Sequence, residues 1–135
     1  MLTNAAITIF NRFPDRANRG FVYIPHVIPD VWFHAAKKVT ADQGGLTSNP
    51  VYKIRIPFPR PDWISPEEYL KQENPRGSFT VKDKDLFLVG IWSGEKTVKG
   101  IEDIKKQFSG TVGVILNHSE NFFGSSKHIR IEGGD

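Results

Sequence analysis

The sequence contains no cysteine, which excludes disulfide bonds, thiol nucleophiles and cysteine-based zinc sites. It also has no apolar run close to the ~20 residues that are needed to span a bilayer. Residues 1–6 lack the basic segment and the following apolar segment of a secretory signal. These absences suit a protein of a reducing compartment, and nothing in the sequence predicts contact with a membrane.

The sequence also has only a small excess of positive over negative charge. The 18 Lys and Arg residues nearly balance the 15 Asp and Glu residues, which leaves a formal net charge of +3 at pH 7. The basic residues are scattered, whereas a dedicated nucleic-acid binder usually carries a dense basic stripe. The charge balance therefore tolerates DNA nearby without predicting a DNA-binding domain.

The chain does contain enough apolar residues for one hydrophobic core. Its 135 residues are 39% hydrophobic, and the ten Phe residues supply much of the area that can be buried. This length suits one domain, residues 1–135, and is too short for two. Nine Pro and twelve Gly divide the sequence into short segments. We therefore expect a mainly β fold, a small barrel or sandwich with long inserted loops and one short helix in the C-terminal half.

Alternating apolar and polar residues mark the expected strands, most clearly where Tyr52, Ile54 and Ile56 alternate with Lys53 and Arg55. The expected strands are residues 5–10, 21–24, 27–35, 51–56, 78–81, 86–90, 111–117 and 127–132. The strands at 78–81 and 86–90 are expected to form a hairpin. Polar loops are expected at residues 11–20, 36–49 and 57–77.

Two prolines and two helical signals refine this picture. Pro25 and Pro29 are expected at strand edges or bulges, because proline cannot donate to a sheet ladder. Residues 101–108 are expected to form the best helix, since their apolar residues share one face and acidic residues precede basic ones. Ser65 and Glu68 flank Pro66 in a capping-box pattern, which predicts a short helical turn from Pro66 to about Lys71.

A search for catalytic motifs finds none. The four His residues form no metal-ligand spacing, and no glycine pattern of a phosphate-binding loop is present. Asp83 and Asp85 flank an expected hairpin turn, where acidic side chains are normally solvated. Ser125 and Ser126 do not belong to a nucleophile-elbow pattern. A carboxylate pair that is distant along the chain stays open, but no pair is singled out.

Several aromatic residues are candidates for contacts with a partner. Trp63 is one, and Phe122 and Phe123 are two more because they lie between Asn121 and Gly124 in an expected loop. Two large apolar side chains on a loop indicate a partner surface. The alternative, that the loop folds back onto the core, remains open for the pair.

Five segments in chain order resemble a known family as a set. They are residues 3–12 (TNAAITIFNR), 28–33 (IPDVWF), 51–57 (VYKIRIP), 66–69 (PEEY) and 78–90 (SFTV followed by DLFLVG). Together they are similar to an uncharacterised family of small prophage proteins of Gram-positive hosts. The sequence departs from that family at Pro29, where Gly is usual, and at Phe79, where Trp is usual.

The resemblance implies a structural role in a bacteriophage particle, because the family's genes lie among phage head and tail genes. The pattern also resembles head-closure, or stopper, proteins, which are small β-barrels with an inserted loop. Those proteins form rings between the portal–adaptor and the tail, which implies a homo-oligomeric ring of about six or twelve copies. The expected location is then the virion, assembled in the cytoplasm of the host bacterium.

For this chain the resemblance implies contacts with portal, adaptor and tail proteins and with DNA passing through the channel. Lys37 and Lys38 in the expected loop 36–49 are candidates to face that DNA, although a solvated loop explains them equally well. We expect no enzymatic activity and no cofactor.

Three alternatives stay open. A tail terminator, or another minor tail or capsid protein, belongs to the same structural class. An oligonucleotide-binding barrel is a different class, and it requires exposed aromatic residues between basic ones on a strand face. Lys53 and Arg55 supply the basic residues of such a face, but the sequence suggests no outward aromatic partner for them. A virion-associated hydrolase is disfavoured by the missing motifs.

Overall fold

Six strands make up about half of the chain. They are β1 (Ala5–Asp15), β2 (Gly20–Asp42), β3 (Gly45–Pro57), β4 (Leu86–Val89), β5 (Val112–Asn121) and β6 (His128–Gly134). Two helices, α1 (Pro66–Lys71) and α2 (Ile101–Gln107), lie in the connections on either side of β4. The computed structural model describes residues 3–15, 17, 19–42, 45–73 and 75–135, with side chains for all of these except residues 37–42 and 45–50.

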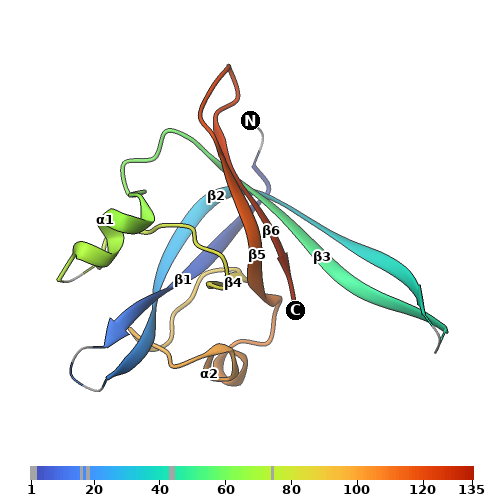
Figure 1. Ribbon diagram of the computed structural model, residues 1–135, viewed down its shortest axis with the longest axis horizontal. Helices are drawn as coiled ribbons and strands as arrows, with labels where there is room; N and C mark the ends of the chain where they lie inside the picture. The colour runs from blue at the N-terminus through green and yellow to red at the C-terminus, as the bar shows by residue number, and fades with distance from the viewer. Residues whose placement is uncertain (1–2, 16, 18, 43–44, 74) are drawn as a thin grey trace.

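The strands close into a barrel in the order β1-β2-β3-β6-β5-β4 (Figure 1). Every neighbouring pair is antiparallel, and β4 closes the barrel by pairing with both β1 and β5. The expected mainly β fold with a helix in the C-terminal half is confirmed, and the barrel rather than the sandwich is the form adopted. Figure 1 shows α1 and α2 outside the barrel, at different places around it.

The barrel interior is filled by side chains at alternate strand positions, as the period-two pattern predicts. Three pairs of isoleucines are fully buried in one cluster: Ile7 and Ile9, Ile54 and Ile56, Ile129 and Ile131. Phe87 of β4 lies across Gly113 and Gly133. A Cβ atom on either glycine would approach the Phe87 ring to within 2.8 or 2.6 Å. These glycines thus leave the space that the buried ring occupies.

Both helices form for the reasons that the sequence predicts. The Ser65 hydroxyl accepts a hydrogen bond from the Glu68 amide at 3.3 Å and caps α1. α1 buries Tyr69, whose ring meets Phe13 of β1 edge to face. α2 buries Ile104 in a second core cluster. The partners of Ile104 there include the other apolar residues of the predicted helical face, namely Val98, Ile101 and Phe108.

Three sequence expectations about loops and hairpins are wrong. Residues 36–49 are not a loop: their described part continues β2 and β3 as a paired hairpin. Residues 11–15, expected in a polar turn, extend β1 and pair with residues 20–24. Residues 78–81 do not form a hairpin with β4; Phe79 makes an isolated bridge to Trp63 instead. Polar residues continue a strand wherever a neighbouring strand supplies the hydrogen bonds, and composition does not reveal that neighbour.

The two prolines of β2 behave differently. The β1–β2 register shifts between Ala5 and Ile7, whose partners are Val31 and Ile28. The extra β2 residue falls beside Pro29, so the expected bulge is confirmed there. Pro25, in contrast, stays in register opposite Phe10, so the strand is not interrupted at that position.

Candidate interaction surfaces

The β2–β3 hairpin extends well beyond the barrel (Figure 1). β1 pairs with β2 only as far as Val31, and β6 pairs with β3 only as far as Tyr52. Pairing between β2 and β3 nevertheless continues to Asp42 and Gly45. We call residues 36–42 and 45–51 the arm. Within the described residues, the arm is a two-stranded ribbon whose outer edges pair with no other strand.

Lys37 and Lys38, the sequence candidates for DNA contact, lie on the arm. Their β-ladder partners on β3 are Pro50 and Asn49. The two lysines are therefore on a strand and not in a loop. Their side chains lie outside the described part of the structure, and the expected contact with DNA stays a prediction.

Of the other three sequence candidates, Trp63 and Phe122 meet beside the end of β5, whereas Phe123 does not join them. Phe122 stacks on Phe58 with ring centroids 4.2 Å apart, and Trp63 packs edge-on against both rings at 5.5 Å. All three rings pack against the main core. Of the two interpretations left open for the Phe pair, folding back onto the core therefore describes Phe122.

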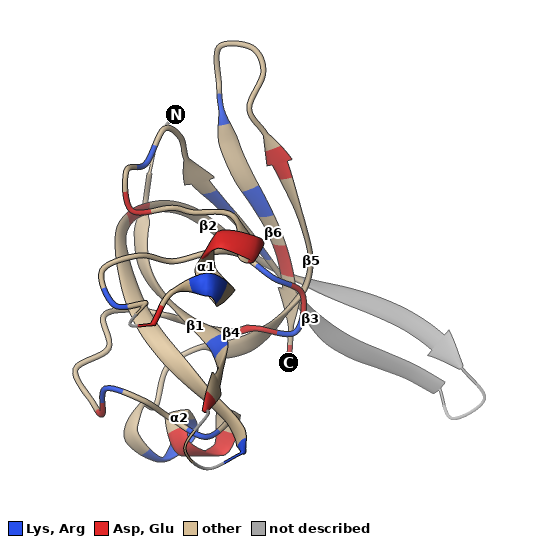
Figure 2. Cartoon of the chain, turned by 60° about the vertical axis from the view of Figure 1, so that its left-hand side comes forward, with Lys and Arg blue, Asp and Glu red and all other residues tan. Residues whose placement is uncertain are grey.

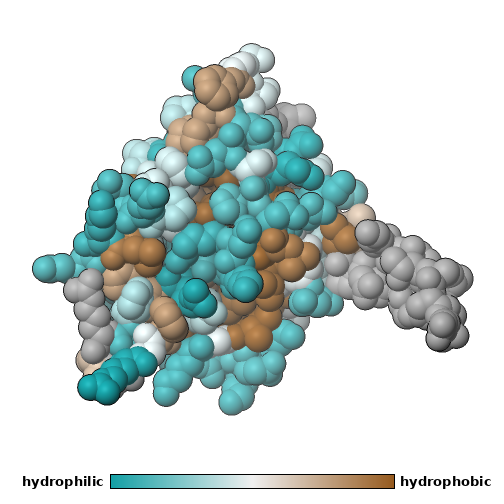
Figure 3. All heavy atoms as spheres, in the orientation of Figure 1, coloured by the Kyte–Doolittle hydropathy of each residue, from teal (hydrophilic) through white to brown (hydrophobic). Residues whose placement is uncertain are grey.

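Phe123 is the opposite case, because 94% of its surface is exposed. The tip that carries it projects at the top of the molecule and shows apolar surface there (Figure 3). Since Phe122 is held by two aromatic contacts, the loop presents Phe123 from a fixed base. A single exposed Phe on a hairpin tip is the kind of side chain that anchors protein contacts.

The outer face of β2 and β3 carries an aromatic and basic group that sequence reasoning missed. Arg55 is the cross-strand partner of Trp32, and its guanidinium lies 4.9 Å from the centre of the Trp32 ring. His34 stacks on Trp32, with the ring centroids 5.9 Å apart. The expectation that Arg55 has no outward aromatic partner is therefore wrong, because register, not sequence distance, brings Trp32 beside it.

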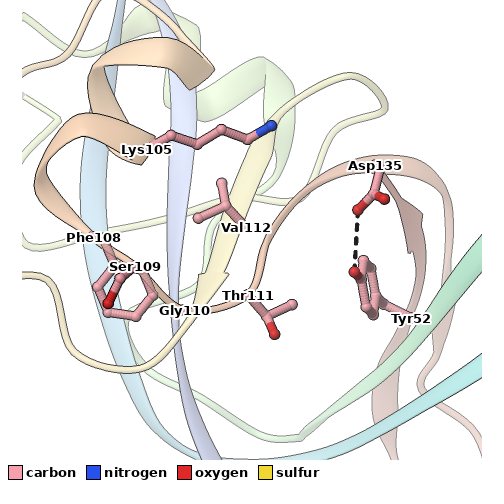
Figure 4. Close-up of a pocket in the computed structure, with 8 residues that line it drawn as sticks. All are labelled: Tyr52, Lys105, Phe108, Ser109, Gly110, Thr111, Val112 and Asp135. Carbon is pink, nitrogen blue, oxygen red and sulfur yellow. Dashed lines mark hydrogen bonds between the residues drawn. The ribbon is translucent and has the colours of Figure 1, made fainter.

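An open cavity of about 700 Å³ lies at the other end of β5, beside the last turn of α2 and the end of β6 (Figure 4). Its walls combine rings, hydroxyls and two opposite charges. The lining residues are Tyr52, Lys105, Phe108, Ser109, Gly110, Thr111, Val112 and Asp135. The Tyr52 hydroxyl donates a hydrogen bond of 3.1 Å to Asp135. Burial, together with that hydrogen bond and the Asp135 charge, raises the pKa of Tyr52.

A polar network is buried near the end of β1. The Asn11 side chain donates to Asp85 at 2.8 Å and to the Thr80 carbonyl at 2.7 Å, and it accepts from the Thr80 amide. The Arg12 amide donates to the other oxygen of Asp85. Asp85 is only 2% exposed, so the expectation of a solvated turn carboxylate is wrong. The Asn11 side chain therefore supplies hydrogen-bond partners to a backbone segment that is about 70 residues away in sequence.

The charges around this network explain its pKa shifts. Burial raises the pKa of Asp85, and this outweighs the hydrogen bond from Asn11 and the nearby Lys82 ammonium. Burial lowers the pKa of Lys82, against the opposing attraction of Asp85. Burial also raises the pKa of Tyr69. Among the described residues, the buried hydroxyls of Tyr69 and Thr80 have no hydrogen-bond partner. The network ties β1 to the segment that precedes β4.

Two His–Asp pairs lie elsewhere on the barrel. His26 contacts Asp62 at 2.8 Å and stacks on Phe79, while Arg60 bonds the same carboxylate at 3.0 Å. Burial opposes ionisation of Asp62, but the hydrogen bonds from Arg60 and His26 outweigh it and lower the pKa of that carboxyl. His118 contacts Asp83 at 2.8 Å. The two pairs are separate and each joins neighbouring segments.

The described part of the chain shows no group of three or more His, Cys, Asp or Glu side chains that could hold a metal ion. No helix within it is long and apolar enough to cross a membrane. Charged residues are interspersed along the drawn strands, helices and loops (Figure 2). The surfaces that stand out are therefore the arm, the aromatic tip, the Trp32 face and the cavity.

These features define a class: a small closed β-barrel with a two-stranded arm and an apolar hairpin tip. The chain belongs to a family of unknown function (DUF6751), whose model matches residues 2–134. No curated protein and no solved structure matches the chain.

Proposed function

We propose that the protein is a structural subunit of a tailed bacteriophage particle, a head-closure (stopper) ring subunit at the head–tail connection. The observation that carries this proposal is the arm. A two-stranded ribbon is marginally stable by itself in water, and its edges expose unpaired amide and carbonyl groups. Such an arm is stabilised when a neighbouring chain adds to its edge, which is how extended segments join subunits in assemblies.

The barrel suits the same role. Closure leaves no long edge in the body of the subunit, so pairing with neighbours is directed to the arm. The sequence resemblance to prophage structural proteins supplies the setting, and Lys37 and Lys38 on the arm are proposed to face DNA in the ring's channel. We propose portal, adaptor and tail proteins as the other partners, and a structural rather than an enzymatic role in the virion.

Electron cryomicroscopy of particles from a host strain that encodes the chain tests this proposal. Density for the six-stranded barrel in a ring at the neck, with arms lying on neighbouring subunits, is the expected result. Density at the tail end of the connector would favour the alternative of a tail terminator. Density in the capsid or elsewhere in the tail would favour another minor structural protein, and absence of the chain from the particle would refute a virion role.

A variant without the arm sharpens the test. Ala35 and Tyr52 are direct partners across the hairpin, so residues 36–51 can be replaced by Asn-Gly, which forms a two-residue turn between such partners. The variant is expected to fold but not to enter particles. Incorporation of this variant into particles to the same extent as the wild-type chain would contradict the role given to the arm.

The Trp32 face favours a second candidate, an oligonucleotide-binding barrel. Trp32 can stack on a base while Arg55 and Lys53, both exposed, contact phosphates. Binding of a labelled single strand at physiological salt, with loss of affinity in Trp32→Ala, would favour this candidate. Removal of Phe21, another exposed ring that stacks under Arg12, is the matched control.

A further inference from the structure

We propose that Phe123 of one subunit inserts into the cavity beside α2 of a second copy of this chain, forming a head-to-tail contact. The inference rests on the proposed function, because it names the contact through which the subunits of a ring would meet. It begins from two features at opposite ends of one strand.

The first feature is the exposed Phe123 side chain, which we call the knob. Phe123 is 94% exposed, while its neighbour Phe122 is fixed between Phe58 and Trp63. A preorganised ring costs less conformational entropy on binding than one on a loose loop. A Phe side chain can bury roughly 150–250 Å² of surface, which makes it a strong anchor when a pocket receives it.

The second feature is the cavity. It lies where β5 begins, at Val112, whereas the knob lies just after β5 ends, at Asn121. A strand of ten residues places these two points about 30 Å apart. Figure 1 shows the tip of the β5–β6 hairpin at the top of the molecule, with the start of β5 at the other end of that strand. A subunit therefore cannot fill its own cavity with its own knob.

The charges around the two features complement each other. Exposed Glu120, in β5, and exposed Lys127, just before β6, lie on the two sides of Phe123 in the sequence. Lys105 of α2 and Asp135, which follows β6, both line the cavity (Figure 4). A docked tip can therefore set each of its charges against one of opposite sign. The Tyr52 and Phe108 rings in the cavity walls supply aromatic surface for Phe123.

A second copy is the occupant that these observations favour. Knob and cavity belong to the same chain and lie on different surfaces, so the contact is heterologous and repeats from subunit to subunit. Such a contact closes into a ring when the rotation between subunits allows it. Among the exposed large hydrophobic side chains of the described residues, Phe123 has the largest exposed fraction, 94%.

Disulfide trapping tests the contact directly, because the chain has no cysteine of its own. Ser125→Cys places a thiol beside the knob, and Ser109→Cys places one on the cavity rim. When the two variants are mixed and oxidised, with an affinity tag on one of them, the mixed dimer should exceed either same-variant dimer at least about tenfold. Adding Phe123→Ala to the knob variant should reduce the mixed dimer to the same-variant level.

The matched control is Ile91→Ala, which removes another exposed apolar side chain, 65% exposed, away from the tip. It should leave the mixed dimer unchanged. A statistical mixture of dimers, or a mixed dimer that persists in Phe123→Ala, would overturn the inference.

Charge reversal provides an independent test of the same contact. Glu120→Lys in the knob variant should reduce trapping, and Lys105→Glu in the cavity variant should restore it. Absence of this rescue would contradict the proposed orientation of the tip.

The result is separable from the proposed function. Trapping uses purified chain, so a trapped head-to-tail dimer would stand even if imaging placed the chain outside the neck. Conversely, a neck location with no specific trapping would refute only the Phe123 contact. If Phe123→Ala blocks entry into particles while trapping is absent, Phe123 contacts a different protein, and the inference is wrong.

Discussion

Strands β2 and β3 pass through two different environments along their length. In the barrel each has a hydrogen-bonded neighbour on both sides and packs isoleucines on the inner face. In the arm the same two strands have only each other among the described residues. This difference separates strand segments that are enclosed by neighbours from a ribbon whose outer edges are unpaired within the described residues. The predictions below test that separation.

The largest effect is expected from the packed side of the comparison. Phe87→Ala should lower the free energy of unfolding by about 3–5 kcal/mol, because Gly113 and Gly133 cannot fill the space left by the ring. Chemical denaturation measures this change. Phe21→Ala, which truncates a ring that is 56% exposed, should change stability by no more than about 0.5 kcal/mol. Similar losses in the two variants would show that Phe87 is not central to the barrel.

The buried polar network should give the next largest effect. Asn11→Ala leaves Asp85 and the Thr80 backbone without their partner, and we expect a loss of about 2–3 kcal/mol. Asn117→Ala, which removes an exposed amide bonded to Glu132, is the matched control and should be nearly neutral. A neutral Asn11→Ala would mean that water replaces the amide at no cost.

Asp85→Asn tests the electrostatic part of the network through its pH dependence. Because the folded-state pKa of Asp85 is raised, wild-type stability from this group is greatest when the carboxyl is protonated, and it falls as pH rises from about 4 through the raised pKa. The substitution should therefore lower the free energy of unfolding by about 1–3 kcal/mol at acid pH, because the new amide nitrogen cannot accept the hydrogen bond that a carboxyl oxygen accepts. That cost should shrink as the pH rises. Denaturation at several pH values measures it, and a cost that grows with pH would contradict burial as the dominant cause.

The smallest effect on stability is expected from replacing residues 36–51 by Asn-Gly. If the arm is independent of the barrel, the free energy of unfolding should change by less than about 1 kcal/mol. Thermal unfolding of this variant beside the wild-type chain gives the comparison. A loss of several kcal/mol would show that the arm contributes to the barrel's own core.

The barrel's inner face could be predicted from the sequence because alternation is a local signal. The positions of Ile54, Ile56, Ile129 and Ile131 follow from the period of two alone, and the helical face around Ile104 follows from the helical period of 3.6 residues. The arm could not be predicted, because strand pairing there is not accompanied by an alternating apolar pattern. Its glycine- and proline-containing sequence resembles a loop.

The candidate surfaces depended on contacts between distant residues. Phe123 was identifiable from two adjacent rings in a turn, but only the packing of Phe122 on Phe58 distinguishes the two. The burial of Asp85 depends on Asn11, and the Trp32 face depends on the register that brings Arg55 beside it. No local pattern in the sequence carries either relation.

Hydrogen exchange read by mass spectrometry tests the central claim, that the arm is completed by another chain. In the free subunit, amides of the arm should exchange at least about a hundredfold faster than those of β1 in the barrel wall. In assembled particles the arm should become as protected as the barrel. Equal protection of arm and barrel in the free subunit, or an arm that stays unprotected in particles, would contradict the account.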